Sequence, residues 1–286
     1  MPVEPPVESP RSLADAYRLL TDGGAAWQPV AGGTDLLVQI AGELAPPPDR
    51  VLDIWGLDEL RGINLDGDEL VIGALTTYTE LRQSALVGEL LPALAEASAT
   101  IGAAQIQNRG TVGGNLVNAS PAGDTLPIWL ATDSLVELGS AAGERSVPAL
   151  GFFTGYRETA RRDDELVLRV RVPLLPRRHV RFRKVGTRRA QAISKVVMAV
   201  SWLTGEDGAW IDTRVALGSV AATPVRARAT EAALNGQHPV GATADAAAAA
   251  LEAEIHPIDD VRSTADYRRL VAGRVLRRLI REEGGW

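Results

Sequence analysis

The residues best suited to chemistry in this chain of 286 residues lie in two glycine-rich segments. The first runs from Ala31 to Asp35 with the sequence AGGTD, and the second from Thr111 to Asn115 with the sequence TVGGN. Paired glycines adopt positive φ readily, so consecutive backbone N–H groups can converge on an anion without a Cβ in the way. Two such segments, each with a threonine near the glycines, indicate a diphosphate held from both sides. A single Gly-Gly pair more often marks only a turn, so the hypothesis depends on both segments.

A small polar stretch after the second segment supports the same hypothesis. It runs from Asn115 to Asp124 with the sequence NLVNASPAGD, which is a poor candidate for a core strand. We expect this stretch to line a cleft, where its side chains can hydrogen-bond a ribose or the edge of a ring.

Short elements around the two segments are predicted to position them. A strand over 27–30 leads into the first segment, and a helix over 36–41 follows it with its N-terminus toward the anion, where the helix dipole favours negative charge. An apolar helix over 90–99 is predicted to lead into the second segment. A helix from Ser12, a strand over 51–54 and a hairpin over 63–75 complete a small mixed unit.

The remainder of the chain is predicted to form a hairpin, a half-buried strand and a second domain. A helix over 126–132 precedes a hairpin over 134–147, and residues 165–172 alternate as a strand does. Pro173 and Pro176 then break the pattern, so we predict domains over 1–175 and 176–286. The second is expected to hold three antiparallel strands (180–184, 194–204 and 210–219) and helices over 225–234, 243–254 and 264–281. The fold class is α+β.

Composition excludes several classes of protein. The net charge is −6, which argues against a general role on nucleic acid or a membrane surface. The chain has no cysteine and three scattered histidines, so we expect no disulfide, no iron–sulfur cluster and no metal site. A secretory signal and a membrane span are absent from the sequence, and the cytoplasm is the expected location.

A basic C-terminal helix leaves two interpretations open. Its arginines suit nucleic acid, but such a face is more often solvated or paired with acidic neighbours, which we favour. The arginines are Arg268, Arg269, Arg274, Arg277, Arg278 and Arg281.

Three runs together resemble the flavin-binding subunit of the molybdenum hydroxylases, the relatives of xanthine dehydrogenase and carbon monoxide dehydrogenase. They are Ala31 to Asp35, the run from Ile101 through Asn115 to Asp124, and Phe182 to Arg189. The resemblance implies an FAD-binding domain of the p-cresol methylhydroxylase and vanillyl-alcohol oxidase type, with the diphosphate between two loops.

The resemblance also implies the residues that contact FAD. Asp124 lies on the flavin side of the cleft, Val167 gives a backbone contact to the ring, and Lys184 lies near its pyrimidine edge. Ile101 stands where some relatives place an aromatic residue against the isoalloxazine. The complete set is Val30, Ala31, Gly32, Gly33, Thr34, Asp35, Leu36, Ile101, Thr111, Gly113, Gly114, Asn115, Asn118, Ala119, Asp124, Val167 and Lys184.

The sequence offers a cofactor cradle and no catalytic constellation, which fits a flavin carrier. The resemblance implies two partners, a large molybdopterin subunit and a small subunit with [2Fe–2S] clusters, and electron transfer through FAD to NAD or another acceptor. A purine or other N-heterocycle is the substrate suggested first, with carbon monoxide and aldehydes behind it. A free-standing FAD oxidoreductase and a cofactor-free scaffold stay open as alternatives.

Overall fold

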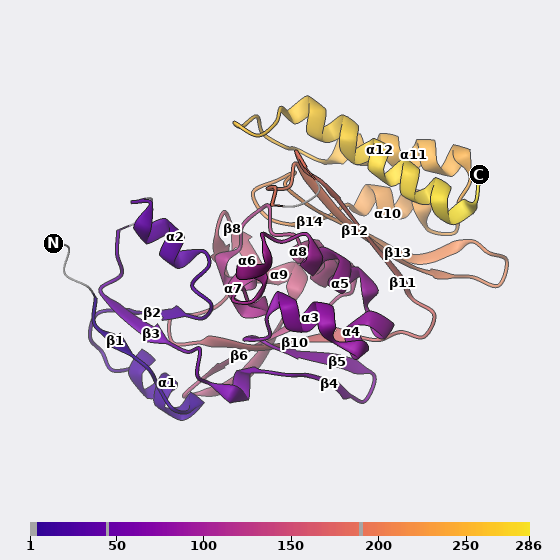
Figure 1. Ribbon diagram of the computed structural model, residues 1–286. Coiled ribbons are helices and arrows are strands. Elements are labelled where there is room, and N and C mark those ends of the chain that lie inside the picture. Colours follow the sequence, from indigo (N-terminus) through magenta and orange to yellow (C-terminus); the bar gives the residue numbers. More distant parts are fainter. Residues whose placement is uncertain (1–4, 44–45, 189–190) are drawn as a thin grey trace.

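The structure is a computed structural model that describes residues 5–43, 46–188 and 191–286 (Figure 1). Arg189, the last residue of the third matching run, lies outside the described residues. Helices and strands are mixed along the whole described chain, as expected for an α+β protein. Within that part of the chain, no helix combines the length and the apolar character needed to cross a membrane.

The N-terminal part forms a small parallel sheet with its own core. The strands lie in the order β1-β3-β2, and β3 pairs in parallel with both neighbours. Leu52 of β3 is fully buried beside Ala16 of α1. The predicted boundaries of β2 and α2 are confirmed. The elements are β1 (Val7–Glu8), α1 (Leu13–Leu20), β2 (Trp27–Val30), α2 (Leu36–Ala41), β3 (Arg50–Asp53) and a 3-10 turn, η1 (Asp58–Leu60).

A five-stranded antiparallel sheet follows, in the order β4-β5-β10-β6-β7. Figure 1 shows the helices α3 to α9 stacked on one side of this sheet. The strands are β4 (Ile63–Asp66), β5 (Glu69–Gly73), β6 (Leu135–Ser140), β7 (Gly143–Pro148) and β10 (Leu166–Pro173), with a separate hairpin of β8 (Phe153–Gly155) and β9 (Glu158–Thr159). The helices are α3 (Tyr78–Gln83), α4 (Ala85–Leu90), α5 (Pro92–Ala99), α6 (Ala104–Gln107), α7 (Val112–Asn118), α8 (Leu126–Ala131) and α9 (Ala149–Phe152).

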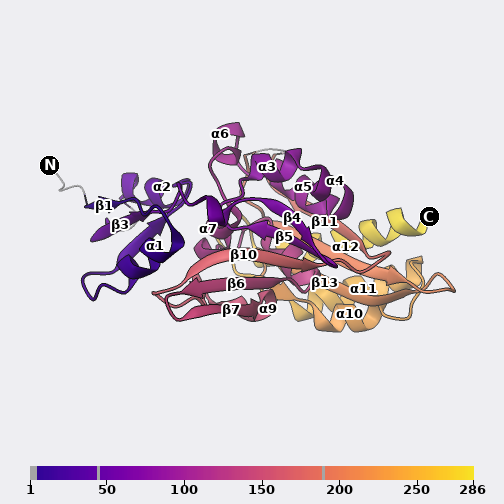
Figure 2. The ribbon, with the colours of Figure 1, turned by 90° about the horizontal axis from the view of Figure 1, so that it is seen from below.

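The C-terminal part is a second antiparallel sheet buried on both faces. In β12, Val197 and Ala199 pack into the core under α5 and α8, whereas Val196, Met198 and Val200 pack against the C-terminal helices. Alternating side chains on a strand point to opposite faces, so the apolar residues of β12 contribute to two separate cores. Figure 2 shows the same arrangement turned by 90°. The elements are β11 (His179–Val185), β12 (Val196–Thr204), β13 (Trp210–Gly218), β14 (Val225–Arg226), α10 (Arg228–Leu234), α11 (Gly241–Glu254) and α12 (Ala265–Gly284).

The structure corrects two of the predicted helices and adds elements that were not predicted. The helix predicted over 90–99 begins at Pro92, because Leu91 takes an extended φ before the proline and ends a preceding helix, α4, that was not predicted. An additional short helix, α6, then precedes the second glycine segment. The helix predicted from Val225 begins instead at Arg228, because Val225 and Arg226 pair with β13. The C-terminal sheet therefore has a fourth, short strand beyond the three predicted.

Candidate cofactor-binding site

The first glycine segment connects β2 to α2 and has unused backbone donors. Gly33 has φ +72°, a conformation that glycine adopts without strain. Within the described part of the chain, the N–H groups of residues 31–35 donate no hydrogen bond. Asp35 is the N-cap of α2 but its side chain caps no backbone N–H. A run of free N–H groups at a helix N-terminus is a ready anion site, so this segment fits a diphosphate.

The second segment is the start of α7, and the short helix α6 precedes it. Thr111 is the N-cap, and its hydroxyl accepts from the N–H of Gly114 at 3.1 Å. The N–H groups of Val112 and Gly113 donate to the carbonyls of Thr76 and Ala74 at 3.0 and 2.7 Å. The expectation that these N–H groups bind an anion is therefore wrong, because the protein already uses them.

The two glycines of this second segment serve different purposes. A Cβ on Gly113 would lie 2.8 Å from the Ala74 side chain, so close packing explains this glycine. Gly114 is exposed, has no positive φ, and a Cβ there would meet only the Thr111 hydroxyl, at 2.9 Å. Little inside the protein requires a glycine at position 114, whereas a ligand lying on this turn would require one.

Direct contact joins the first segment to the residues just before the second. A Cβ on Gly32 would lie 1.6 Å from the carbonyl oxygen of Arg109, so the chains meet backbone to backbone. The Arg109 guanidinium lies over the Trp55 ring, 3.7 Å from its centroid, and Nε donates to the Gly32 carbonyl at 3.5 Å. The sequence hypothesis that both segments form one site is supported by this contact.

Arg157 is a residue of the site that the sequence analysis missed. It occupies the turn between β8 and β9, in a left-handed conformation with φ +57°. Its guanidinium donates to the side-chain oxygen of Asn118, after the second segment, and lies 3.6 Å from the Asp35 carboxylate in the first. One side chain therefore bridges both segments, and it places a second arginine beside the free N–H groups. Its neighbour Tyr156 is exposed, and the sequence around Arg157 contains no motif that would have indicated this role.

Asp124 and Lys184, predicted on the flavin side of the cleft, form a buried ion pair. Lys184 Nζ lies 2.6 Å from Asp124 Oδ2 and donates to the Thr100 carbonyl at 3.1 Å. Less than a tenth of either side chain is exposed. The hydroxyl of Ser194, which the sequence analysis did not single out, donates to the other oxygen of Asp124. Burial raises the pKa of the Asp124 carboxyl, and the Lys184 charge opposes that rise.

The remaining predicted residues lie in different parts of the structure. Ile101 follows Thr100 and is half-buried, so it lies next to the ion pair. Val167 is buried in β10. The carbonyl of the next residue, Leu168, accepts from the N–H of Ala74, and the carbonyl of Ala74 accepts from the N–H of Gly113. Asn115 accepts from Thr125, and Ala119 ends α7 in the left-handed conformation with φ +45°. The other predicted residues, Val30, Ala31, Thr34 and Leu36, are half-buried around the first segment.

The described residues hold no group of histidine and carboxylate side chains suited to a metal ion. The site consists of the first glycine segment with its free N–H groups, the exposed turn at Gly114, the arginines Arg109 and Arg157, and the buried ion pair. Such an arrangement can bind and orient a cofactor.

Comparisons with known proteins found two matching family models and several similar chains. Residues 3–175 match the family described as "FAD binding domain in molybdopterin dehydrogenase", and residues 181–283 match "CO dehydrogenase flavoprotein C-terminal domain". The chain is 33% identical over 276 residues to the carbon monoxide dehydrogenase medium chain of Hydrogenophaga pseudoflava, covering 95% of this chain and 94% of that one. It is 37% identical over 226 residues to the xanthine dehydrogenase FAD-binding subunit of Escherichia coli O157:H7, covering 77% and 75%.

A solved structure gives the same result. A chain of the carbon monoxide dehydrogenase from Hydrogenophaga pseudoflava superposes with a TM-score of 0.92 at 34% identity, covering 97% of this chain and 96% of that chain. The structural similarity therefore extends over nearly the whole chain.

Proposed function

Because the chain belongs to the FAD-binding subunits of the molybdenum hydroxylases, we propose that the diphosphate of its FAD lies on the free N–H groups of residues 31–35 and against Gly114. FAD binding and the oxidoreductase class follow from the family itself. The observation that carries the placement is the run of unused N–H groups around Gly33, beside two arginines. These donors are half-exposed and have no partner within the described residues, so they are available to a ligand.

The buried ion pair is proposed to lie at the other end of the cofactor, by the isoalloxazine ring. Lys184 and Asp124 are held rigidly by Thr100 and Ser194, which suits residues that orient a ring. Ile101 lies beside this pair. The backbone next to Val167 is connected to the second segment by hydrogen bonds through Ala74. Support for this placement comes from the resemblance to the family, which implies ring contacts by Asp124, Val167 and Lys184. Ile101 stands where some relatives place an aromatic residue.

We also propose the finer description of the fold. The first domain is of the p-cresol methylhydroxylase and vanillyl-alcohol oxidase type, with its boundary near residue 175. The two family matches, which end at 175 and begin at 181, support a boundary between β10 and β11.

In the assembled enzyme, the chain is proposed to work between a small [2Fe–2S] subunit and an acceptor such as NAD, with a large molybdopterin subunit that oxidises the substrate. When bound, FAD supplies the two-electron redox chemistry of this chain. The chain's own residues bind and orient it. A purine or another N-heterocycle is the substrate proposed first. Carbon monoxide and aldehydes are the alternatives, because similar chains are named as subunits of carbon monoxide, xanthine and glyceraldehyde dehydrogenases.

The proposed electron route is tested with the three subunits produced together. Under anaerobic conditions, addition of hypoxanthine, carbon monoxide or an aldehyde is expected to bleach the flavin absorbance, and NAD is then expected to restore it. The same chain produced without its partners should show no bleaching with any of these substrates. Bleaching of the isolated chain by a substrate would instead identify a free-standing FAD oxidoreductase.

Replacing Arg157 with glutamine is expected to weaken FAD binding about three- to tenfold at low salt. The substitution leaves the Asp35 carboxylate uncompensated beside the diphosphate, and the penalty should shrink as salt screens it. Adding Asp35→Asn to Arg157→Gln should recover most of the affinity. Arg177→Gln is the matched control, because Arg177 is also exposed and left-handed, with φ +63°. Equal affinities for Arg157→Gln and Arg177→Gln, measured by FAD titration, would remove Arg157 from the site.

A further inference from the structure

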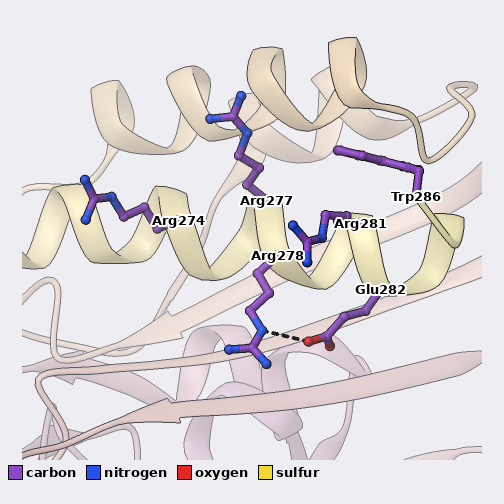
Figure 3. A pocket seen from close by; sticks show the side chains of 6 residues that line it. All are labelled: Arg274, Arg277, Arg278, Arg281, Glu282 and Trp286. Atoms are coloured by element: carbon purple, nitrogen blue, oxygen red, sulfur yellow. Dashed lines mark hydrogen bonds and ion pairs between the residues drawn. The ribbon is translucent and has the colours of Figure 1, made fainter.

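The outward face of α12 carries a stripe of arginines between apolar and aromatic side chains. The exposed residues lie three, four or seven positions apart along one side of the helix. We call them the α12 stripe, and they are Tyr267, Leu270, Arg274, Arg277, Arg278 and Arg281. Trp286 lies at its end, 46% exposed, with its indole N–H bonded to the Pro239 carbonyl at 2.7 Å. A hollow of about 540 Å³ is lined by Arg274, Arg277, Arg278, Arg281, Glu282 and Trp286, whose side chains are drawn in Figure 3.

Folding does not account for this stripe. The opposite face of α12 holds the buried side chains that pack on α11 and the sheet, including Leu276 and Ile280. Arg268, on that inner side, is 4% exposed and bonds Asp260 and two carbonyls, so it is a structural arginine. The favoured interpretation of this helix is that its arginines are solvated or paired with acidic neighbours. Pairing is confirmed for Arg268, Arg269, Arg277 and Arg278.

Charge within the stripe is only partly balanced by the chain itself. Arg277 pairs with Asp245 of α11, and Arg278 with Glu282 at 2.8 Å. Among the described residues, Arg274 and Arg281 form no ion pair or hydrogen bond. A chain of net charge −6 therefore presents a local positive surface with two unbalanced guanidiniums.

The composition of the stripe is that of a protein interface. Tyrosine, tryptophan and arginine are enriched at interface centres, and arginine there pairs with carboxylates through two parallel hydrogen bonds. Tyr267, Leu270 and Trp286 are each more than 40% exposed and give apolar contact area on both sides of the charge. An acidic partner surface with room for these side chains would be complementary in both charge and chemistry.

We propose that the α12 stripe and Trp286 form a docking surface for an acidic protein surface of another subunit of the assembled enzyme. This inference rests on the proposed function for the existence of those subunits. It adds the face of the chain that one of them contacts, which lies on the C-terminal helices and away from the glycine segments (Figure 1).

The test reverses the two unbalanced charges. Arg274→Glu/Arg281→Glu is compared with wild type and with Arg11→Glu/Arg177→Glu, which changes the net charge equally at exposed arginines outside the stripe. Each chain is titrated with the co-produced molybdopterin and iron–sulfur subunits at low and high salt, and its FAD content is read from absorbance. The stripe variant is expected to bind at least about tenfold more weakly at low salt, with the difference shrinking at high salt and FAD content unchanged. The control should bind as wild type does.

Three results would overturn the proposal. Equal binding by the stripe variant and wild type would remove the docking surface while leaving the proposed function intact. A wild-type chain that fails to join those subunits would overturn the proposed partners and the surface with them. Self-association of the wild-type chain that the stripe variant abolishes, seen by sedimentation, would assign the surface to a second copy of the chain.

Discussion

Replacing Gly114 with alanine is expected to lower FAD affinity by at least about tenfold, which corresponds to 1.4 kcal/mol or more. Gly114 is exposed at the first turn of α7, so an added methyl group points to where the diphosphate is proposed to lie. The protein itself should tolerate the methyl. Its one close neighbour is the Thr111 hydroxyl at 2.9 Å, and alanine is favoured over glycine in a helix by about 1 kcal/mol.

Two other glycines provide controls for this prediction. Gly88 lies exposed in α4, where a Cβ meets open space, so Gly88→Ala should leave FAD affinity unchanged and stabilise the fold slightly, as alanine does in a helix. Gly32→Ala should destabilise the apo-protein as well, because its Cβ would lie 1.6 Å from the Arg109 carbonyl. Titration of the apo-proteins with FAD, together with thermal unfolding, separates the three cases. Equal affinities for Gly114→Ala and Gly88→Ala would contradict the placement of the diphosphate.

Replacing Lys184 with methionine is expected to destabilise the protein by about 3–5 kcal/mol near neutral pH. The substitution leaves the Asp124 carboxylate buried with only the Ser194 hydroxyl as a side-chain partner. Burial already raises the pKa of Asp124, and loss of the lysine charge raises it further. Over a range of pH, Asp124 of the variant should then be protonated in the folded state and ionised in the unfolded state.

The pH dependence of Lys184→Met follows from that difference. Between the ordinary pKa of Asp124 and its raised value, the folded state binds more protons than the unfolded state. Stability of the variant should therefore fall as pH rises through this range. Lys184→Met/Asp124→Asn should regain most of the loss and lose this pH dependence, because no buried charge remains. Denaturant unfolding across the acidic to neutral range measures both, and a loss that is independent of pH would contradict the ion-pair account.

The structure also changes what Lys184 can do for a flavin. A lysine without a partner would stabilise negative charge on the reduced ring, but Asp124 at 2.6 Å neutralises this one. The pair as a whole contributes little net charge, so its main effects are expected to be orientation of the ring and rigidity of the cleft.

Local sequence patterns predicted much of the fold because they depend on neighbouring residues. The boundaries of β2 and α2 follow from a short apolar run, two glycines and a second apolar run. The hairpins and the C-terminal strands follow from period-two alternation and turn residues. Both glycine segments were recognised for the same reason, and their contact through Gly32 and Arg109 agrees with one shared site.

The missed features depend on residues that are distant in sequence. Nothing around Arg157 indicates that it meets Asp35 and Asn118, since these contacts span 122 and 39 positions of the chain. Ser194 is one serine among many until the fold brings it to Asp124, 70 positions away. The helical start of α7 was misread because Gly113 and Gly114 suggest a loop. Packing against Ala74 and the cap by Thr111 stabilise the helix despite its two glycines.

The most direct test of the account is to identify the cofactor released by acid precipitation of the purified chain. The chain has no cysteine, and none of its three histidines belongs to either glycine segment, so a covalent flavin link is not expected. We expect a yellow supernatant that contains FAD, identified by mass, at one equivalent per chain, over a colourless pellet. Release of FMN, or a colourless protein that takes up no added FAD, would contradict the central claim.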